Sequence, residues 1–462
     1  MPSLQTDIAI IGAGTAGLAA YRAAKAAGKR SLLIQGGPFG TTCARVGCMP
    51  SKLLIAPAEA AHSIERFSEF GLKLHCDVEV DGAAVMARVR RERDRFVGFV
   101  LDGVDKIPAE DKLLGYARFV DEHTLQVDDH TTVYAERVVI ATGSSPSHPP
   151  LWKSLGDRLV TNDEVFYWHD LPRSVAVFGP GVIGLEIGQA LHRLGVRVKV
   201  FGRGGGVGPL SDPVLLAQAR ELFNQEFYLD TNALADVKLT EDGQAVCVSY
   251  RHLDGTQQVE HFDYLLAATG RTPNLKNLGL ENTSLALDER GVPVFDRFTM
   301  QAGAGPIFIA GDANNDLPLL HEAADEGKIA GANAAAYPNV QPGLRRAPLG
   351  VVFTDPQIAL VGNGWRAVQD KTYVTGSVSF ADQGRSRVML RNKGLLHVYA
   401  EKGAGRFLGA EMIGPDAEHI GHLLAWSLQA GLTVAQMLDM PFYHPVVEEG
   451  LRTALRDVAA KV

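Results

Sequence analysis

Two cysteines are the residues of this chain whose spacing most directly indicates chemistry. Cys43 and Cys48 lie five positions apart in the segment GTTCARVGCMPSK, residues 40–52. A helix that begins near Cys43 would place them about one turn apart, within reach of disulfide geometry. A helix N-terminus and the nearby Lys52 would both favour the thiolate, the reactive form of cysteine. The pair therefore predicts thiol–disulfide redox chemistry.

Two other interpretations of this pair remain open. Zinc takes four ligands, usually in close pairs, whereas Cys76 and Cys247 are isolated and no Cys/His cluster lies near the pair. We therefore expect no metal site. The other alternative is two buried, inert thiols. Four cysteines are too few for a disulfide framework, and we expect Cys76 and Cys247 to be ordinary thiols.

A histidine near the C-terminus could supply the proton transfer that disulfide exchange needs. His444 lies in FYHPVVEE, residues 442–449, just before a predicted final helix. A group that titrates near neutrality can take a proton from an attacking thiol and return one to a leaving sulfur. Glu449, five positions on, could orient the imidazole and stabilise its charged form; Glu448 is an alternative partner.

Two glycine-rich turns predict the elements that position these residues. Residues 12–17 follow an apolar strand at 7–11 and precede an alanine-rich helix and a second strand at 31–34. Residues 179–184 lie in the same order between strands at 174–178 and 197–201. Gln35 lies 23 positions after Gly12, and Gly202 lies 23 positions after Gly179. Each follows the second strand of its unit directly. Two units in one register predict two βαβ dinucleotide-binding folds; unrelated glycine turns are the alternative.

The glycines of each turn have distinct physical roles. The first permits the tight turn, the second lets the backbone approach a pyrophosphate, and the third lets helix and strand pack closely. The helix N-terminus then offers free N–H groups and a partial positive charge to the phosphates. The chain is thus expected to bind two dinucleotides, or one if the second unit has lost its ligand. The glycines are Gly12, Gly14 and Gly17, and Gly179, Gly181 and Gly184.

The rest of the chain completes the predicted architecture. Apolar strands end in small-residue loops at 137–146, 264–274 and 306–313, as expected at the carboxyl edge of a parallel sheet. From about Leu349, alternating strand patterns are followed by helical ones, which indicates a separate α+β domain. The predicted fold is α/β, with two Rossmann-like dinucleotide-binding domains and a C-terminal α+β domain.

Composition excludes several classes of partner. A formal net charge of −8 argues against nucleic acid, which requires a basic face. No apolar run is long enough to span a bilayer, and the N-terminal segment has no basic leader. We expect a cytoplasmic enzyme with no membrane partner.

Together these segments resemble the pyridine nucleotide–disulfide oxidoreductases, a family that includes dihydrolipoamide dehydrogenase, glutathione reductase and mercuric reductase. The resemblance covers essentially the whole chain: the CxxxxCxPSK segment, both glycine turns, ATGSSP, ATGRTPN, the AGD segment at 310–312 and the C-terminal HPxxxE. It implies a homodimer whose FAD-binding and central domain spans 1–147 and 273–345. The NAD(P)-binding domain would span 148–272 and the dimerisation domain 346–462.

The same resemblance implies cofactors and residue roles. Cys48 would face the flavin and Cys43 would exchange with the substrate disulfide. Lys52 would pair with Glu186 beside the flavin ring. His444 and Glu449 would form the acid–base pair, in a site shared by two subunits, although Val446 replaces the usual threonine. FAD would contact Gly12, Gly14, Gly17, Gln35, Thr42, Lys52, Ala117, Thr142, Gly143 and Asp312, and NAD or NADP would contact Gly179, Gly181, Gly184, Arg203 and Gly270.

Two positions depart from the family pattern. Gln35 replaces the acidic residue that often binds a ribose, and its neutral amide can still hydrogen-bond hydroxyls. Gly202 stands where NAD-specific members carry glutamate, and Arg203 follows. Loss of the carboxylate removes repulsion against a 2′-phosphate that the arginine could bind. We expect NADPH to be accepted or preferred; the alternative is a solvated Arg203 and NADH binding.

The substrate is the least defined part of the prediction. Pro-Ser-Lys after Cys48 favours dihydrolipoyl dehydrogenase, acting on a free or protein-bound lipoyl group. The nucleotide pattern favours an NADPH-dependent reductase of glutathione-reductase type. Mercuric and thioredoxin reductases are disfavoured because they need C-terminal thiols. A non-catalytic flavoprotein, such as a redox sensor or assembly subunit, stays an alternative of another class, although it would not need all six predicted catalytic residues.

Overall fold

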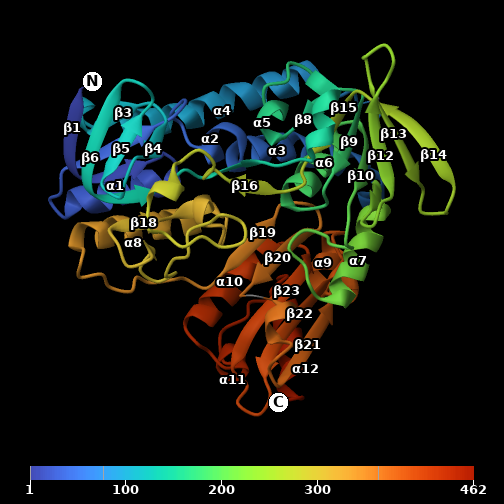
Figure 1. Cartoon of the computed structure of the whole chain (residues 1–462). Coiled ribbons are helices and arrows are strands. Elements are labelled where there is room, and N and C mark those ends of the chain that lie inside the picture. The colour runs from blue at the N-terminus through green and yellow to red at the C-terminus, as the bar shows by residue number, and fades with distance from the viewer. Residues whose placement is uncertain (1, 76–77, 363) are drawn as a thin grey trace. The chain divides into compact units, whose positions relative to one another are not determined.

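A computed structural model describes residues 2–75, 78–362 and 364–462 (Figure 1). Cys76 therefore lies outside the described residues. The chain divides into two compact units. Unit 1 comprises residues 1–50, 90–146 and 271–345, and unit 2 comprises residues 51–89, 147–270 and 346–462.

Unit 1 is built on a parallel sheet with antiparallel additions. Its central strands run in the order β18 (Ile307–Ile309), β6 (Thr131–Ile140), β1 (Ser3–Ile11), β2 (Ser31–Gln35) and β3 (Lys112–Leu114). Residues 8–11 of β1 are buried on both faces, as expected for a parallel strand covered by helices. The antiparallel additions are β17 (Gln301–Ala302), β4 (Ala117–Phe119) and β5 (Thr124–Val127).

Helices and a short ribbon complete unit 1. The helix α1 (Thr15–Ala26) packs with α8 (Leu320–Ala336) through buried small side chains such as Ala20 and Ala330. The carboxyl-terminal part of α4 (Gly82–Asp105) contributes Val104 to the same core. A two-stranded ribbon joins β7 (Ser144–Pro146) to β16 (Arg271–Pro273).

Unit 2 contains a second parallel sheet of the same kind. Its order is β11 (Tyr228–Asp230), β10 (Arg197–Phe201), β9 (Ser174–Phe178), β15 (Tyr264–Ala267) and β8 (Leu159–Val160). Every residue of β9 is buried. The helices α6 (Val182–Arg193) and α7 (Pro213–Asn224) flank β10 in sequence. An antiparallel meander follows: β12 (Ala235–Leu239), β13 (Val246–Arg251), which holds the buried Cys247, and β14 (Gln257–Phe262).

The C-terminal part of unit 2 is an antiparallel sheet covered by helices. Its helix α12 (Glu449–Ala459) buries Leu451, Leu455 and Val458, whose spacing places them on one face. The remaining elements are α10 (Ala417–Gln429), α11 (Val434–Leu438) and strands in the order β19 (Leu349–Val352), β20 (Gln357–Val361), β23 (Phe407–Gly414), β22 (Leu395–Glu401) and β21 (Tyr373–Ser379). The predicted fold class, two Rossmann-like domains and a C-terminal α+β domain, is confirmed.

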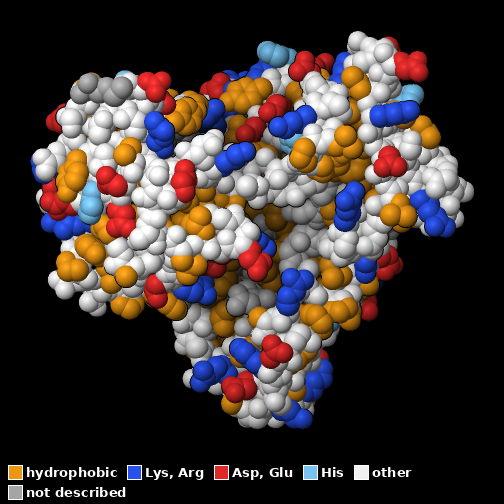
Figure 2. Space-filling model, viewed as in Figure 1, with side chains coloured by type: hydrophobic (Ala, Val, Ile, Leu, Met, Phe, Trp, Pro, Cys, Tyr) orange, Lys and Arg blue, Asp and Glu red, His pale blue; other side chains and the backbone are white. Residues whose placement is uncertain are grey.

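The surface carries charges of both signs. Figure 2 shows lysine and arginine side chains interspersed with aspartate and glutamate on the face in view. Among the described residues, no helix has the length and hydrophobicity that crossing a membrane requires.

Candidate redox site

The cysteine pair lies across the junction of two helices. Cys43 belongs to α2 (Thr42–Val46), and Cys48 is the first residue of α3 (Cys48–Glu65). The expected single helix near Cys43 is thus divided at Gly47, whose φ and ψ of −125° and −115° are not helical. A Cβ on Gly47 would lie 3.2 Å from Cys43 Cα, so glycine allows the chain to turn tightly beside the first cysteine.

The two side chains meet as a reduced pair. The Cys43 and Cys48 thiols form a hydrogen bond, and Cys48 is exposed whereas Cys43 is partly buried. The hydrogen bond with Cys48, followed by burial, raises the pKa of the Cys43 thiol. The Cys43 thiol therefore keeps its proton more readily than an ordinary cysteine does.

An ion pair lies further along α3. Lys52 Nζ is 3.0 and 2.8 Å from the two carboxylate oxygens of Glu186 on α6. The Glu186 side chain is only 4% exposed, and Glu186 Oε1 also accepts the Phe353 N–H at 3.0 Å. Lys52 Nζ lies 4.4 Å from the centroid of the Phe353 ring. A buried carboxylate with these partners holds the ammonium in one position.

The first glycine turn has the shape that a dinucleotide needs. A Cβ on Gly17 would lie 1.8 Å from Gly12 O, so α1 packs directly on the turn. Gly14, the N-cap of α1, has open space in front of it. Thr142 Oγ1 is buried without a hydrogen-bond partner in the described part of the chain. These features fit an FAD pyrophosphate at the start of α1.

Other predicted FAD residues lie at the carboxyl ends of the same sheet. Asp312 Oδ2 accepts a hydrogen bond of 2.7 Å from Ser144 Oγ, which in turn accepts one of 2.8 Å from Arg271 Nε. Gly143 adopts φ +68°. Two further positions were predicted: Thr42 begins α2, and Ala117 pairs with Val127 between β4 and β5.

The Gln35 side chain forms hydrogen bonds within the glycine turn and its surroundings. Its Oε1 accepts the Ala13 N–H at 2.7 Å, and its Nε2 donates to the carbonyls of Gly36 and Pro38 at 3.0 and 3.2 Å. The amide thus links the glycine turn to the end of β2, and its Oε1 keeps a second lone pair.

The second glycine turn repeats the first. A Cβ on Gly184 would lie 1.9 Å from Gly179 O, and Gly181, the N-cap of α6, faces open space. Gly270, with φ +119°, lies in the loop after β15, and its carbonyl accepts the Ser147 N–H at 2.9 Å. The turn fits a second dinucleotide.

Position 202 excludes a side chain for a steric reason. A Cβ on Gly202 would lie 2.6 Å from Pro180 Cγ and 3.2 Å from Thr231 Cα. Because the proline ring is rigid and sits inside the glycine turn, an acidic residue at 202 would displace that turn. The sequence showed that the carboxylate is missing, but not that proline in the turn and glycine at 202 depend on each other.

The adjoining loop brings together cationic and amide groups. Arg203 is exposed at its start. A Cβ on Gly205 would lie 3.7 Å from Arg220 Nη1 and 3.6 Å from Asn232 Nδ2, so both groups lie beside the loop. Sequence reasoning missed Arg220 and Asn232, because neither belongs to a motif and only the fold brings them to residues 203–206.

The predicted acid–base residues are in contact. His444 Nδ1 lies 3.0 and 3.2 Å from the Glu449 carboxylate oxygens, and Arg452 Nη2 donates to Glu449 Oε1 at 2.8 Å. Desolvation opposes ionisation, but the hydrogen bonds from His444 and the Val446 N–H, with the charge of Arg452, hold the pKa of Glu449 below its usual range. The His444 side chain is 80% exposed, and Glu448 forms no such contact with it.

Comparisons with known proteins agree with this arrangement. Residues 6–327 match the family model described as pyridine nucleotide-disulphide oxidoreductase, and residues 349–455 match the dimerisation domain of that family. A dihydrolipoyl dehydrogenase of Geobacillus stearothermophilus is 30% identical over 97% of this chain and 95% of its own length. A mercuric reductase of Shigella flexneri is 30% identical over 97% of this chain and 80% of its own length.

Solved structures share the fold. LpdA from Mycobacterium tuberculosis superposes with a TM-score of 0.81 at 25% identity, covering 98% of this chain and 99% of its own. The flavoprotein disulfide reductase RclA from Escherichia coli has a TM-score of 0.80 at 23% identity over 99% of this chain and all of its own, a likeness of fold alone. The chain therefore belongs to the pyridine nucleotide-disulphide oxidoreductase family, whose members use FAD and NAD(P).

Proposed function

We propose that the chain is a dihydrolipoyl dehydrogenase, which transfers electrons from dihydrolipoamide to a nicotinamide nucleotide through FAD and the Cys43–Cys48 pair. The observation that carries the proposal is the hydrogen-bonded thiol pair at the start of α3, the same helix that carries the Lys52–Glu186 ion pair. The similarity to the dihydrolipoyl dehydrogenase of Geobacillus stearothermophilus supports the choice of substrate.

The cysteine pair would act by two exchange steps. A thiolate of dihydrolipoamide attacks Cys43 Sγ of the oxidised pair, so that a mixed disulfide forms and Cys48 leaves as a thiolate. The second substrate thiol loses its proton and attacks the mixed disulfide, which releases lipoamide and the Cys43 sulfur. When bound, FAD supplies the two-electron relay from the reduced pair to the nucleotide.

His444 would be the acid–base group in these steps. Its imidazole would accept the proton of the attacking substrate thiol and return one to the Cys43 sulfur as that sulfur leaves. In the reverse direction it would deprotonate Cys43, whose raised pKa otherwise keeps it as a thiol. Glu449, held ionised by its contacts, would orient the imidazole and stabilise its charge.

The loop after β10 supports a preference for NADPH over NADH. Glycine at 202 leaves no carboxylate to repel a 2′-phosphate, and Arg203, Arg220 and Asn232 lie on or beside this loop. Charge-assisted hydrogen bonds from arginine to a phosphate contribute more than neutral ones. This same feature favours the second candidate, an NADPH-dependent disulfide reductase of glutathione-reductase type.

Steady-state turnover tests the proposal and separates the two candidates. The purified protein is assayed with dihydrolipoamide plus NAD⁺ or NADP⁺, and with glutathione disulfide plus NADPH. Turnover of dihydrolipoamide alone supports the proposal, whereas turnover of glutathione disulfide alone moves the chain to the second candidate. Higher kcat/KM with NADH or NAD⁺ would contradict the nucleotide preference, and a flavin that neither nucleotide reduces would indicate a non-catalytic flavoprotein.

A further inference from the structure

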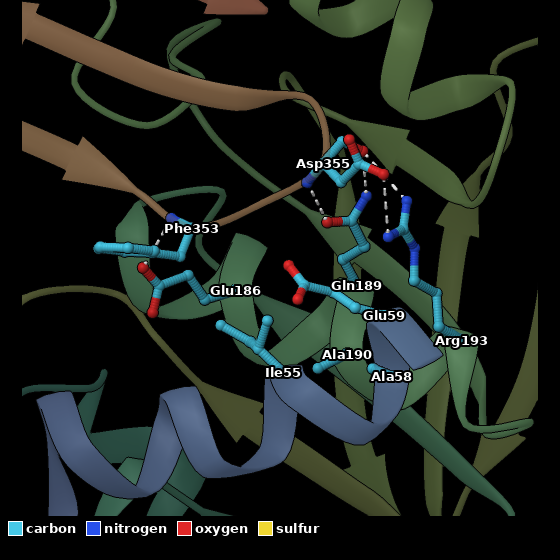
Figure 3. Close-up of a pocket in the computed structure, with 9 residues that line it drawn as sticks. All are labelled: Ile55, Ala58, Glu59, Glu186, Gln189, Ala190, Arg193, Phe353 and Asp355. Carbon is cyan, nitrogen blue, oxygen red and sulfur yellow. Dashed lines mark hydrogen bonds and ion pairs between the residues drawn. The ribbon is translucent and has the colours of Figure 1, made fainter. Parts of the chain in front are cut away.

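A small cavity lies beside the Lys52–Glu186 ion pair, between α3 and α6 (Figure 3). Lys52, Ile55 and Glu59 follow one another at three- and four-residue spacing, so they share one face of α3. The cavity volume is about 10 Å³, which is close to the space that one water molecule occupies. Such a cavity holds water only where polar groups face it, and this one is lined by both polar and charged side chains.

One wall of the cavity is a carboxylate that already has partners on both of its oxygens. Glu186 lines it and is also bound by Lys52 and by the Phe353 N–H. The opposite wall is equally fixed, because Gln189 accepts the Asp355 N–H at 2.8 Å and donates to the Asp355 carbonyl at 2.8 Å. A polar molecule between these walls would therefore meet groups that are held by hydrogen bonds.

The carboxylate of Glu59, unlike the side chains of Glu186 and Gln189, is not held by hydrogen bonds from the described residues. It projects from α3 into the space between Glu186 and Gln189 (Figure 3). Within residues 2–75, 78–362 and 364–462 it has no hydrogen-bond or ion-pair partner. Glu59 is also an exposed residue, so it borders both solvent and the cavity.

The cations near Glu59 are bound to other carboxylates. Arg193 contacts Glu226 at 2.5 Å and Asp355 at 3.3 Å, and Arg391 contacts Asp416 at 3.0 Å. In the part of the chain that the structure describes, neither arginine forms an ion pair with Glu59, so each acts on it only at a distance.

Two acidic groups also face Glu59. Partial burial of its carboxyl group beside the cavity raises the pKa of Glu59, although the residue as a whole is exposed. The negative charges of Asp355 and Glu418 add to that rise, and Arg193 and Arg391 oppose it. A carboxyl group in these surroundings can carry a proton under conditions where a solvated glutamate does not.

We propose that this cavity is a one-water proton-exchange site that connects Glu59 to the Lys52–Glu186 ion pair. A water in the cavity would accept the proton of the Glu59 carboxyl as that O–H bond breaks, and would give one of its own protons to Glu186. Solvent then restores the proton of Glu59, so no oxidant or reductant is consumed. Glu59 is thus a positioning residue for proton supply, not a group that contacts substrate.

The overall reaction makes such a route useful. Reduction of a disulfide by NAD(P)H takes up one proton from solvent, and the reverse reaction releases one. The inference rests on the proposed function, in which Lys52 and Glu186 lie beside the flavin. Glu59 would let the ion pair exchange a proton with solvent although Glu186 itself is 4% exposed, whereas His444 would exchange protons with the thiols.

The first test is infrared titration of the unreduced holoprotein. Glu59→Gln keeps the size of the side chain but cannot exchange a proton, and Glu65→Gln, an exposed position on the same helix, is the matched control. We expect a protonated-carboxyl band with a raised titration midpoint that Glu59→Gln removes, Glu65→Gln leaves and Glu186→Gln shifts. A band that survives Glu59→Gln, or that ignores Glu186→Gln, would overturn the proposal.

The second test follows proton uptake by an indicator dye while NADPH or NADH reduces the flavin. We expect Glu59→Gln to slow proton uptake about tenfold relative to flavin bleaching, and Glu65→Gln to match the wild type. Equal uptake rates in all three proteins would also overturn the proposal. No disulfide substrate is present, so failure of the lipoamide assignment leaves this result intact. If neither nucleotide reduces the flavin, the proposed function fails and the infrared titration still decides the inference.

Discussion

At the scale of single residues, the two cysteines differ although they touch. The hydrogen bond with Cys48 and burial both raise the pKa of Cys43, whereas Cys48 begins α3 and is exposed. A thiol that keeps its proton reacts slowly until a base removes it. This asymmetry is consistent with a division of labour in which Cys43 needs His444 and Cys48 does not.

Single cysteine variants test that division. Cys48→Ser should lose turnover and also the long-wavelength absorbance expected of the reduced holoprotein, because it would lack the thiolate that we propose to face the flavin. Cys43→Ser should lose turnover by roughly three orders of magnitude or more but keep the absorbance band. Visible spectra of both reduced variants decide the matter, and a band that persists in Cys48→Ser would reverse the two roles.

The Glu449 carboxylate allows a second test at this scale. Its pKa lies below the usual range because of His444, the Val446 N–H and Arg452, so it stays charged from neutral to mildly acidic pH. Glu449→Gln should lower kcat about 10- to 100-fold and change KM little, since it would disorient the proposed base, His444, without removing it.

The adjacent Glu448→Gln is the matched control and should behave like the wild type. Steady-state kinetics across pH provide the measurement. A Glu449→Gln enzyme with normal kcat at every pH would show that the contact does not serve catalysis.

At the scale of elements, different glycines of one turn serve helix packing and ligand access. Gly184 gives room for α6 to pack on the turn, while Gly181 gives room for a ligand. Gly184→Ala should therefore disturb the fold, and Gly181→Ala should leave thermal stability unchanged but raise KM for the nucleotide about tenfold. Calorimetry and nucleotide titration measure the two effects, and a stable Gly184→Ala protein with normal nucleotide binding would contradict this account.

The start of α7 depends on a buried carboxylate. Asp212 caps the helix through the Val214 N–H at 2.8 Å, and its Oδ2 lies 2.7 Å from His397 Nδ1 and 2.9 Å from the Tyr399 hydroxyl. Burial opposes ionisation of Asp212, but the His397 contact, the N–H of Val214 and the Tyr399 hydroxyl lower its pKa overall. The charged carboxylate of Asp212 therefore links the start of α7 to His397 and Tyr399 on β22.

Removal of this carboxylate should destabilise unit 2. Asp212→Ala should cost about 2–4 kcal/mol at neutral pH, because a helix cap is lost and buried partners stay unpaired. A lowered folded-state pKa means that the stabilisation is present above the ordinary aspartate pKa and is lost as pH falls through the lowered value. Calorimetry should show that the difference in unfolding free energy between wild type and variant decreases in acid. A difference independent of pH would refute the role of the charge.

Much of this architecture is predictable from sequence, and the exceptions share a cause. Both glycine turns and the His444–Glu449 contact follow from motifs whose members lie close together in sequence, whereas the Lys52–Glu186 pair, 134 positions apart, followed from the family resemblance. The surroundings of Arg220 and Glu59 do not follow from motifs, because they come from several separate segments of the chain. The division of the cysteines between two helices also escaped prediction, since Gly47 is compatible with a helix as well as with its interruption.

At the scale of the whole molecule, the single chain leaves several large apolar side chains uncovered. Trp426 is 68% exposed and Tyr443 80%, with Leu423 and Met440 also exposed, all within the region that matches the family's dimerisation domain. Apolar surface of this kind is typical of a subunit interface. We propose a homodimer in which His444, equally exposed, completes the site of the partner subunit.

Mixed dimers test this sharing. Cys48→Ser and His444→Ala subunits are each inactive, but a heterodimer with shared sites has one intact site, formed by the cysteines of one subunit and the histidine of the other. Co-expression in equal amounts should then restore about a quarter of wild-type activity, since half of the dimers are mixed. Tagged heterodimers without activity would show that each subunit uses its own histidine.

The tight turn at Gly47 also affects how far the stability of the fold differs between the oxidised and the reduced cysteine pair. A disulfide between Cys43 and Cys48 closes a loop with only four residues between the cysteines. By the loop-closure relation, such a link removes little entropy from the unfolded chain and stabilises the fold by only about 2 kcal/mol, less than a link across a longer loop. The oxidised and reduced proteins are therefore close in thermodynamic stability, and opening the bond in each turnover releases no large stretch of chain.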